Sequence, residues 1–499
     1  MSDIVLKVTE VSKAFGGVQA LSKVNLTIKK GEIHCLAGGN GSGKSTLIKI
    51  ISGFYKADSG TIQINGKDYQ KLSTMESIEQ GVQVIYQDFS VFPNLTVAEN
   101  IALNDAVASK KKLVNWKKVY QKAEEALKKI NIVLPLHEKV EELSVSDKQL
   151  IAIARAMLHK ANLLIMDEPT TALTRKEIHK LFTAIRHLQK QGVAVLFVSH
   201  KLDEVFEIAD NFTILRNGQN VITDSTKNVD HKKFIYYMTG RSFDAELFQP
   251  EVSQEQKPLF QVKGLGLENG FSDISFSVYP GEVIGIIGLL GSGRTELAMA
   301  LFGLYAAETG EIWIGDKQVT IDSPITAIKH KIGYVPEDRL SEGLALGQSI
   351  ARNMSIANID SLCKKGNQVD FDKVDENVLH WAQELSLVMQ NAQQPAHTLS
   401  GGNQQKVVLA KWLEIAPKVL VLNGPTVGVD VGAKHDLHNY LHQLAATNEI
   451  AIIIISDDVL EVLENCNRIF VMNHGRFTAE FKNTEVTEQE LLAEMTRQE

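Results

Sequence analysis

The stretch "GGNGSGKST", Gly38 to Thr46, contains the pattern G-x-x-x-x-G-K-[ST]. An apolar run, "EIHCLAG", precedes it, and "STLIKIISG" follows it with the pattern of a helix that ends near Gly53. In this strand–loop–helix setting, glycines allow backbone N–H groups to close around a phosphate at the helix N-terminus. The stretch therefore predicts a phosphate-binding loop within an α/β fold.

The side chains of this loop have separate expected roles. Lys44 would neutralise the β- and γ-phosphates of a nucleotide, and the Ser45 hydroxyl would ligate Mg²⁺. The other residues of the predicted cradle supply backbone and hydroxyl groups, and they are Gly38, Asn40, Gly41, Ser42, Gly43 and Thr46.

A second stretch, "NLLIMDEPTTALT" from Asn162 to Thr174, supplies carboxylates, which the phosphate loop lacks. Its apolar run predicts a buried strand that ends in Asp167, whose carboxylate would hold the Mg²⁺ shell. Glu168 lies where a base is needed to activate the water that attacks the γ-phosphate. Alone, the same letters would also suit a surface turn; after a phosphate loop they indicate nucleotide hydrolysis.

The chain contains one long internal repeat. "KKGEIHCLAGGNGSGKSTL" matches "YPGEVIGIIGLLGSGRTEL" at an offset of 250 residues between Gly31 and Gly281. Later pairs keep nearly the same offset, which is 256 between Pro169 and Pro425. A period this long indicates duplicated domains, not a solenoid.

In each half, short apolar runs alternate with helical stretches, as in α/β domains. "VAVLFVSH" and "IAIIIIS" predict buried strands, and "NWKKVYQKAEEALKKINIV" predicts an amphipathic helix with a solvated lysine face. The stretch "DAELFQPEVSQEQKPLF", Asp244 to Phe260, is polar and carries two prolines. It predicts a first domain over residues 1–243, a short linker over 244–258 and a second domain over 259–499.

The composition narrows the function classes. A net charge of −8 argues against broad electrostatic binding to nucleic acid. The three dispersed cysteines favour buried thiols in a reducing compartment. No N-terminal segment has the form of a signal peptide, and no apolar run approaches the ~20 residues that span a bilayer. A role at a membrane would therefore depend on a partner.

The ordered motifs resemble those of ATP-binding cassette (ABC) ATPases. They run from the phosphate loop through "VIYQD", "LSVSDKQ", "LLIMDEPTTALT" and "VLFVSHKLDEV", and the second half adds the signature "LSGGNQQK". "GLLGSGRTEL" and "YVPEDR" narrow the resemblance to fused, double-cassette ATPases of bacterial monosaccharide importers of the ribose, galactose and xylose type. The resemblance implies two tandem P-loop ATPase domains, each with a RecA-like α/β core, an antiparallel β subdomain and a helical signature subdomain.

The resemblance also implies two composite sites, each made from the phosphate loop of one half and the signature of the other. In the first site, Phe15 would stack on adenine, Gln87 would sense the γ-phosphate and contribute to the metal site, and His200 would contact the γ-phosphate. The signature residues facing this site would be Ser400, Gly401, Gly402 and Asn403. Every expected element is present there.

The residues that differ from the family pattern all fall in the second composite site. Its loop residues are Gly291, Gly293, Arg294 and Thr295, with Arg294 in the place of lysine. At the other positions stand Leu265 for Phe15, Glu337 for Gln87, Asn423 and Gly424 for the acidic pair, Asp457 for His200, and Val145 and Ser146 for the signature glycines. This sorting predicts one hydrolytic site and one that at most binds nucleotide.

The family resemblance implies an energy-coupling subunit that uses ATP and Mg²⁺. Its partners would be two integral-membrane permease subunits and, through them, a periplasmic sugar-binding protein, with no nucleic acid. It would lie peripherally on the cytoplasmic face of the bacterial inner membrane. Ribose, galactose, xylose, galactofuranose and a sugar-derived autoinducer all remain open as cargo, as does a homo- or heterodimeric permease.

Two other functions compete. A soluble tandem-cassette ATPase acting on ribosomes or DNA would typically carry a long basic linker or zinc-type cysteine clusters, and this chain has a short linker with glutamates and no CxxC pair. A purely regulatory nucleotide-binding protein would not need the intact first site.

Overall fold

The protein is described by a computed structural model that covers residues 3–86, 91–108, 114–159, 161–170, 173, 175–199, 201–240, 256–366, 368–429 and 431–497. The chain divides into two compact units, residues 1–243 (unit 1) and 244–499 (unit 2). Most of the predicted linker, residues 244–255, lies outside the described residues. Within the described ranges, no helix combines the length and apolar character that a membrane crossing requires.

Unit 1 contains two sheets and two groups of helices. Its antiparallel sheet has the order β2-β1-β4-β5, and its mixed sheet has the order β10-β9-β3-β8-β7-β6. The strands are β1 (Ile4–Phe15), β2 (Val18–Lys29), β3 (Ile33–Ala37), β4 (Ser59–Ile64), β5 (Lys67–Tyr69), β6 (Val82–Ile85), β7 (Leu163–Asp167), β8 (Ala194–Val198), β9 (Asn211–Arg216) and β10 (Gln219–Ser225). The helices are α1 (Lys44–Ile51), α2 (Thr74–Glu79), α3 (Val97–Ala108), α4 (Trp116–Lys129), α5 (Val145–Leu158), α6 (Arg175–Lys190), α7 (Leu202–Ile208) and α8 (His231–Thr239).

Unit 2 repeats this topology. Its sheets have the orders β12-β11-β14-β15 and β16-β19-β20-β13-β21-β22, and a small β17-β18 hairpin is added. The strands are β11 (Phe260–Leu267), β12 (Phe271–Val278), β13 (Val283–Ile287), β14 (Thr309–Ile314), β15 (Lys317–Val319), β16 (Ile332–Val335), β17 (Cys363–Lys364), β18 (Gln368–Val369), β19 (Val419–Asn423), β20 (Ala451–Ser456), β21 (Arg468–Asn473) and β22 (Arg476–Lys482). The helices are α9 (Arg294–Leu301), α10 (Pro324–Lys329), α11 (Ile350–Ser355), α12 (Phe371–Glu384), α13 (Gly401–Leu413), α14 (Val431–Asn448), α15 (Val459–Asn465) and α16 (Glu488–Met495).

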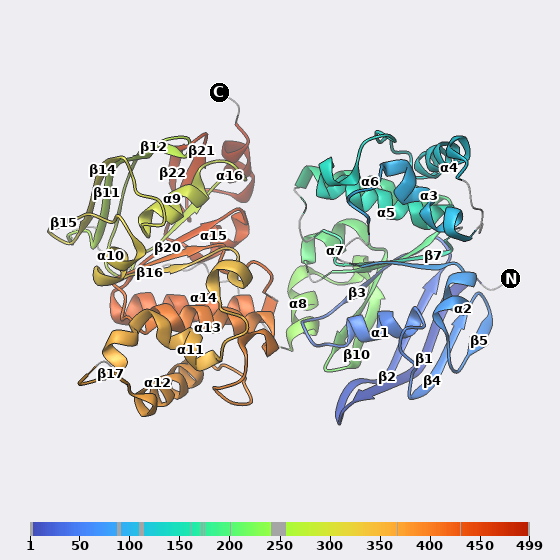
Figure 1. Ribbon diagram of the computed structural model, residues 1–499, viewed down its shortest axis with the longest axis horizontal. Helices are drawn as coiled ribbons and strands as arrows, with labels where there is room; N and C mark the ends of the chain where they lie inside the picture. Colours follow the sequence, from blue (N-terminus) through green and yellow to red (C-terminus); the bar gives the residue numbers. More distant parts are fainter. Residues whose placement is uncertain are drawn as a thin grey trace. The chain divides into compact units, whose positions relative to one another are not determined.

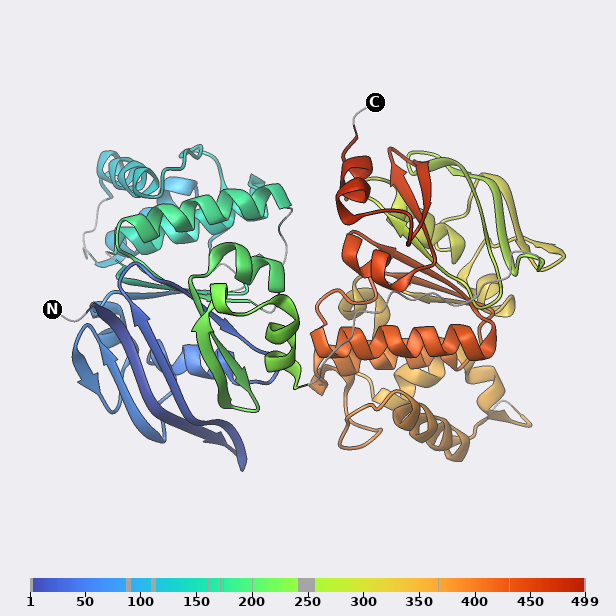
Figure 2. The same ribbon diagram turned by 180° about the vertical axis from the view of Figure 1, so that it is seen from behind.

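The mixed sheet is the centre of each unit. In unit 1, helices α3, α4 and α5 form a group on the opposite side of this sheet from the antiparallel sheet (Figures 1 and 2). Alternate residues of one strand face the two layers: Ile33 of β3 packs in the core with the helices, and Leu36 packs in the core with the antiparallel strands. The three expected parts, an α/β core, an antiparallel β part and a helical part, are confirmed in both halves.

Local predictions from residue pattern are also confirmed. Strands β8 and β20 are buried along their whole length, as their continuous apolar runs predict. Helix α4 buries Val119, Ala123 and Leu127 on one face, while Trp116 at its first turn is exposed. Strands β3, β7 and β8 are parallel neighbours, so their carboxyl ends lie at the same edge of the sheet.

Candidate functional site

The phosphate loop of unit 1 connects β3 to α1, and its glycines are required by packing. Gly38 has φ +148°, and a Cβ there would lie 2.3 Å from the Leu215 carbonyl oxygen. Gly43 has φ +102°, and a Cβ there would lie 2.5 Å from Leu21 Cδ2. The loop backbone lies so close to its neighbours at both of these positions that only glycine fits there.

Lys44 begins helix α1 and folds back over the loop. Its Nζ donates to the carbonyl oxygens of Gly38 at 2.6 Å and Gly39 at 3.0 Å. The side chain is buried, so its charge is held at the helix N-terminus, where an anion is favoured. Ser45 and Thr46 follow it in the first helical turn.

Asp167 and Glu168 stand at the carboxyl end of β7. Burial raises the pKa of Asp167, the neighbouring Glu168 raises it further, and Lys44 and Lys49 act in the opposite direction. The charge of Lys44 therefore acts on this carboxylate. A divalent cation would stabilise the ionised form of such a crowded carboxylate pair, so the donor set fits Mg²⁺.

Glu168 also has an unusual backbone. Its φ is +46°, in the left-handed region, and its N–H donates to the Val198 carbonyl oxygen at 3.1 Å. A residue other than glycine in this conformation costs on the order of 1 kcal/mol, and such strain concentrates at functional sites. The equivalent residue of unit 2 is Gly424, at φ +57°, which adopts the same conformation without that cost.

A buried glutamate in each unit ties the strand ends together, and sequence reasoning missed it. In unit 1, Glu204 accepts hydrogen bonds from Thr170 Oγ1 at 2.7 Å and Ser199 Oγ at 2.8 Å. In unit 2, Glu461 accepts from the hydroxyls of Thr426 and Ser456 at 2.6 and 2.7 Å. The sequence did contain a signal for this cluster, because each half has a serine five residues before a glutamate. The second half keeps this pair although it lacks the acidic pair before the proline.

The Glu461 cluster predicts an acid-sensitive unit 2. Burial would raise the pKa of Glu461, but Lys434 and His438 lower it well below its ordinary value of 4.5. The stabilisation is therefore present above about pH 4.5 and is lost as the pH falls below it. We expect Glu461→Gln to lower the free energy of unfolding of unit 2 by about 2–4 kcal/mol at pH 7.

Calorimetry of the full chain at pH 7 measures this effect as a fall of about 5–10 °C in the unfolding midpoint of unit 2. At pH 4, below the ordinary pKa of the glutamate, the difference between the two proteins should be smaller. Glu485→Gln, at an exposed position, is the matched control. A midpoint for Glu461→Gln equal to that of the control would show that the buried cluster does not stabilise the unit.

The two signature helices begin differently. Ser144 caps α5, because its hydroxyl accepts from the backbone N–H of Asp147 at 3.1 Å. In the first turn of α13, which the structure describes fully, the Ser400 hydroxyl makes no such cap and accepts instead from Asn403 Nδ2 at 3.1 Å. The first backbone N–H groups of α13 are thus left for an external acceptor, whereas those of α5 are partly satisfied within the chain.

Arg339, a second residue that sequence reasoning missed, joins α13 to the turn after β19. Its Nη1 and Nη2 donate to the carbonyl oxygens of Val427 at 2.6 Å and Gly428 at 3.2 Å, and its Nε lies 3.4 Å from Gln404 Oε1. A Cβ on Gly401 would lie 2.8 Å from Arg339 Nη2. The signature glycine therefore makes room for this arginine.

The equivalent loop in unit 2 holds a different set of charges. Arg294 is 2% exposed, and its Nη2 lies 3.9 Å from Glu337 Oε1 and 3.8 Å from Asp457 Oδ1. Asn423 ends β19 with its side chain buried, and Gly424 follows it. Three neighbouring strands thus bring together the replaced residues Glu337, Asn423 and Asp457, as the repeat predicted.

One pairing inferred from the repeat is wrong. A constant offset of 250 places Leu265 opposite Phe15, but the strand register pairs Leu265 with Ile274 and Val11 with Val24. Leu265 is therefore the counterpart of Val11, and both are buried. The offset fails because the hairpin is shorter in unit 2: Leu6 pairs with Ile28 in unit 1, whereas Phe260 pairs with Val278 in unit 2.

Phe15, the predicted adenine platform, is partly exposed. Its ring is 41% exposed at the end of β1 and packs edge-on against Tyr55 with centroids 5.1 Å apart. Gln87 and His200, the other two predicted residues of this site, lie outside the described residues. Ser400, Gly401, Gly402 and Asn403 belong to unit 2.

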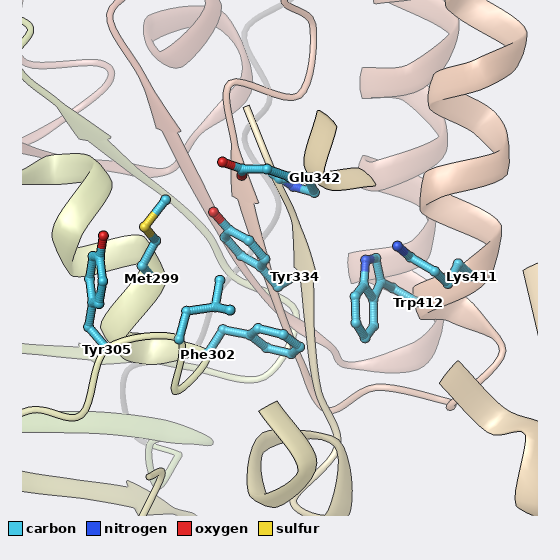
Figure 3. Close-up of a pocket in the computed structure, with 9 residues that line it drawn as sticks. Met299, Phe302, Tyr305, Tyr334, Glu342, Lys411 and Trp412 are labelled. Carbon is cyan, nitrogen blue, oxygen red and sulfur yellow. The ribbon is translucent and has the colours of Figure 1, made fainter. Parts of the chain in front are cut away.

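Unit 2 also contains a pocket of about 450 Å³ beside β16 (Figure 3). Phe302 stacks on Tyr334 at 5.2 Å and meets Trp412 edge-on at 5.0 Å, and burial lowers the pKa of Lys411 to about 8. The repeat pairs Phe302, Tyr334 and Trp412 with the smaller Ser52, Val84 and Ala156. The two units therefore differ here as well as at their phosphate loops.

Comparison with known proteins identifies the family. The family model described as "ABC transporter" matches residues 21–171 and 271–427. The chain belongs to the ABC transporter family. Each match contains one of the two phosphate loops, so the protein is an ABC ATPase with two cassettes.

Relatives match this ABC ATPase along its whole length. A ribose import ATP-binding protein of Bacillus subtilis is 38% identical over 98% of both chains. A galactose/methyl galactoside import ATP-binding protein of Photobacterium profundum is 37% identical over 99% of both chains. Among solved structures, an ABC transporter cassette in its ADP conformation aligns with 48% of this chain and 99% of its own, at 28% identity and a TM-score of 0.43.

Proposed function

We propose that this ABC ATPase is the energy-coupling subunit of a bacterial monosaccharide importer, with one hydrolytic and one non-hydrolytic site. The sugar-import names of relatives that match both cassettes support the transport role. The observation that carries the asymmetry is the charge set at the two loops. In unit 1, the charge of Lys44 acts on Asp167, which neighbours Glu168, whereas in unit 2 Arg294 stands near Glu337 and Asp457.

In the proposed hydrolytic site, the loop amides and Lys44 bind the phosphates of ATP. Asp167 and Ser45 would hold Mg²⁺, which, when bound, neutralises charge that develops on the phosphates. Glu168 would accept the proton of the attacking water from its position directly after β7. Phe15 stacks on adenine, and Gln87 and His200 contact the γ-phosphate.

The signature of the second cassette would complete this site. Ser400, Gly401, Gly402 and Asn403 would offer a hydroxyl and uncapped backbone N–H groups to the γ-phosphate. The opposing signature, with Val145 and Ser146, would face the loop that contains Gly291, Gly293, Arg294 and Thr295. That second site would bind nucleotide without hydrolysing it.

Restoring the lost acidic pair should not restore hydrolysis. A Cβ on Gly424 would lie 3.0 Å from both Glu337 Cγ and Val427 Cγ2, in a backbone conformation that strains any other residue. Asn423→Asp with Gly424→Glu would also leave Arg294, Val145 and Ser146 unchanged. We expect the ATP hydrolysed per chain at saturation to change by less than about two-fold. A doubling would contradict the proposal that the second site lacks more than its carboxylates.

We further propose two permease subunits as direct partners and a periplasmic sugar-binding protein beyond them, with the ATPase on the cytoplasmic face of the inner membrane. Co-purification from detergent-solubilised membranes tests this assignment. We expect an integral-membrane permease to co-purify with the tagged chain. Recovery of ribosomes or DNA-bound complexes in place of a permease would overturn the transport role.

A further inference from the structure

The phosphate loop of unit 2 contains buried polar groups that lack partners. The Nε and Nη1 atoms of Arg294 and the Oγ of Ser292 are buried without a hydrogen bond to any part of the chain that the structure describes. Asn423, at the end of β19, is buried beside this loop and is 1% exposed. Leaving buried donors unpaired is costly, and an anion bound at the N-terminus of α9 would pair with those of Arg294.

The side of this loop that faces the strand ends is acidic. Glu337 follows β16 and Asp457 follows β20, and each has one carboxylate oxygen within 4 Å of Arg294 Nη2. The two acidic side chains are 35% and 61% exposed, so they border the opening of the site. Lys44, the counterpart of Arg294, instead donates to two loop carbonyl oxygens.

Mg²⁺ does not fit this arrangement. At the end of β19, the position of the metal-holding carboxylate is taken by Asn423, which is neutral. The two carboxylates nearby already face the guanidinium of Arg294, and its fixed charge would repel a divalent cation at the same place. The guanidinium can itself neutralise a phosphate through two parallel hydrogen bonds.

The same residues limit how many phosphates the bound nucleotide can have. A β-phosphate within the loop would meet Arg294 and the amides at the start of α9. A further phosphate would extend toward the strand ends, where Glu337 and Asp457 carry like charge, and no metal ion would screen the repulsion. We propose that the loop of unit 2 binds a nucleoside diphosphate without Mg²⁺, in preference to a triphosphate.

This inference rests on the proposed function, because it concerns the site that the proposal treats as non-hydrolytic. Binding of ADP and ATP to the full chain carrying Lys44→Ala, which silences the loop of unit 1, tests it by equilibrium titration in EDTA. We expect one ADP per chain, bound about ten-fold more tightly than ATP or better. Added Mg²⁺ should not strengthen ADP binding, because the metal complex is not the ligand.

Substitutions in unit 2 distinguish an effect of charge at the site on nucleotide binding from an effect of misfolding. Adding Arg294→Ala should abolish ADP binding. Because that side chain is buried, a second variant, Glu337→Gln with Asp457→Asn, probes the exposed rim, and it should bring ATP affinity to within about three-fold of ADP affinity. Asp360→Asn with Glu376→Gln removes the same charge from exposed positions of unit 2 outside the site, and it should leave the preference for ADP unchanged.

Either of two results in the binding titrations would overturn the inference. One is ATP binding as tight as ADP binding in the Lys44→Ala chain, and the other is an increase of about ten-fold in affinity on adding Mg²⁺. Absence of any nucleotide at unit 2 would also overturn it while leaving a single-site ATPase intact. Failure of the proposed function would appear separately, as equal losses of ATP turnover from substitutions in the two loops.

Discussion

Glu168→Gln is expected to reduce ATP turnover by about 10²–10⁴-fold, because it removes the proposed general base and keeps the size of the side chain. Glutamine has nearly the same shape as glutamate, so the left-handed backbone at this position is under the same strain in both proteins. A loss of turnover therefore reports on proton transfer and not on folding. Nucleotide binding should be retained, since Lys44 and the loop amides are unchanged.

Arg294→Ala is the matched substitution in the other loop. It should lower turnover much less, by about ten-fold at most, through coupling between the two sites. The measurement is the steady-state ATPase rate of each purified full-length variant, with unfolding midpoints compared, because Arg294 is buried. Equal losses from Glu168→Gln and Arg294→Ala would rule out the assignment of hydrolysis to one site.

The sequence was sufficient to predict the parts of the fold that depend on local pattern. Gly38 and Gly43 mark a loop that only a strand and a helix can flank in this way, and both have the positive φ that glycine permits. Strands β8 and β20 followed from uninterrupted apolar runs. These features need no knowledge of distant neighbours.

Features that depend on distant neighbours were not predicted. The correspondence of Leu265 with Val11 follows from strand pairing, and a hairpin shortened by four residues hides it from a constant offset. Glu461 appears in sequence as one of several acidic residues of a helix, and only the fold brings Thr426 to it. The bonds of Arg339 to carbonyl oxygens leave no trace in residue type.

The two units share some residues near the strand ends and differ in others. Both units keep the Ser–Glu–Thr clamp around Glu204 and Glu461, which holds the strand ends in place. At the end of β19, unit 2 has Asn423 and Gly424 in place of the acidic pair of unit 1. The buried cluster that supports the strand ends is therefore kept in unit 2, while the residues beside its phosphate loop differ from those of unit 1.

Gly401→Val should be the second most damaging substitution, because it acts on the signature proposed to serve the hydrolytic site. A Cβ at this position would lie 2.8 Å from Arg339 Nη2 and 3.0 Å from the Gly428 carbonyl oxygen. A branched side chain would thus displace the start of α13, where the uncapped N–H groups would meet the γ-phosphate. Losing such preorganised donors typically costs about 10²–10³-fold in turnover.

Val145→Gly is the matched change in the other signature, because Val145 stands where the repeat places Gly401. It should alter turnover by less than about three-fold, since Ser144 would still cap α5 and the site facing this helix is proposed not to hydrolyse ATP. Overpacking at Gly401 is expected to cost about 1–3 kcal/mol of stability, so turnover is measured at a temperature where both variants are folded by circular dichroism. If Val145→Gly impaired turnover as strongly as Gly401→Val, the two signatures would serve equivalent sites, and the asymmetry between the cassettes would lie elsewhere.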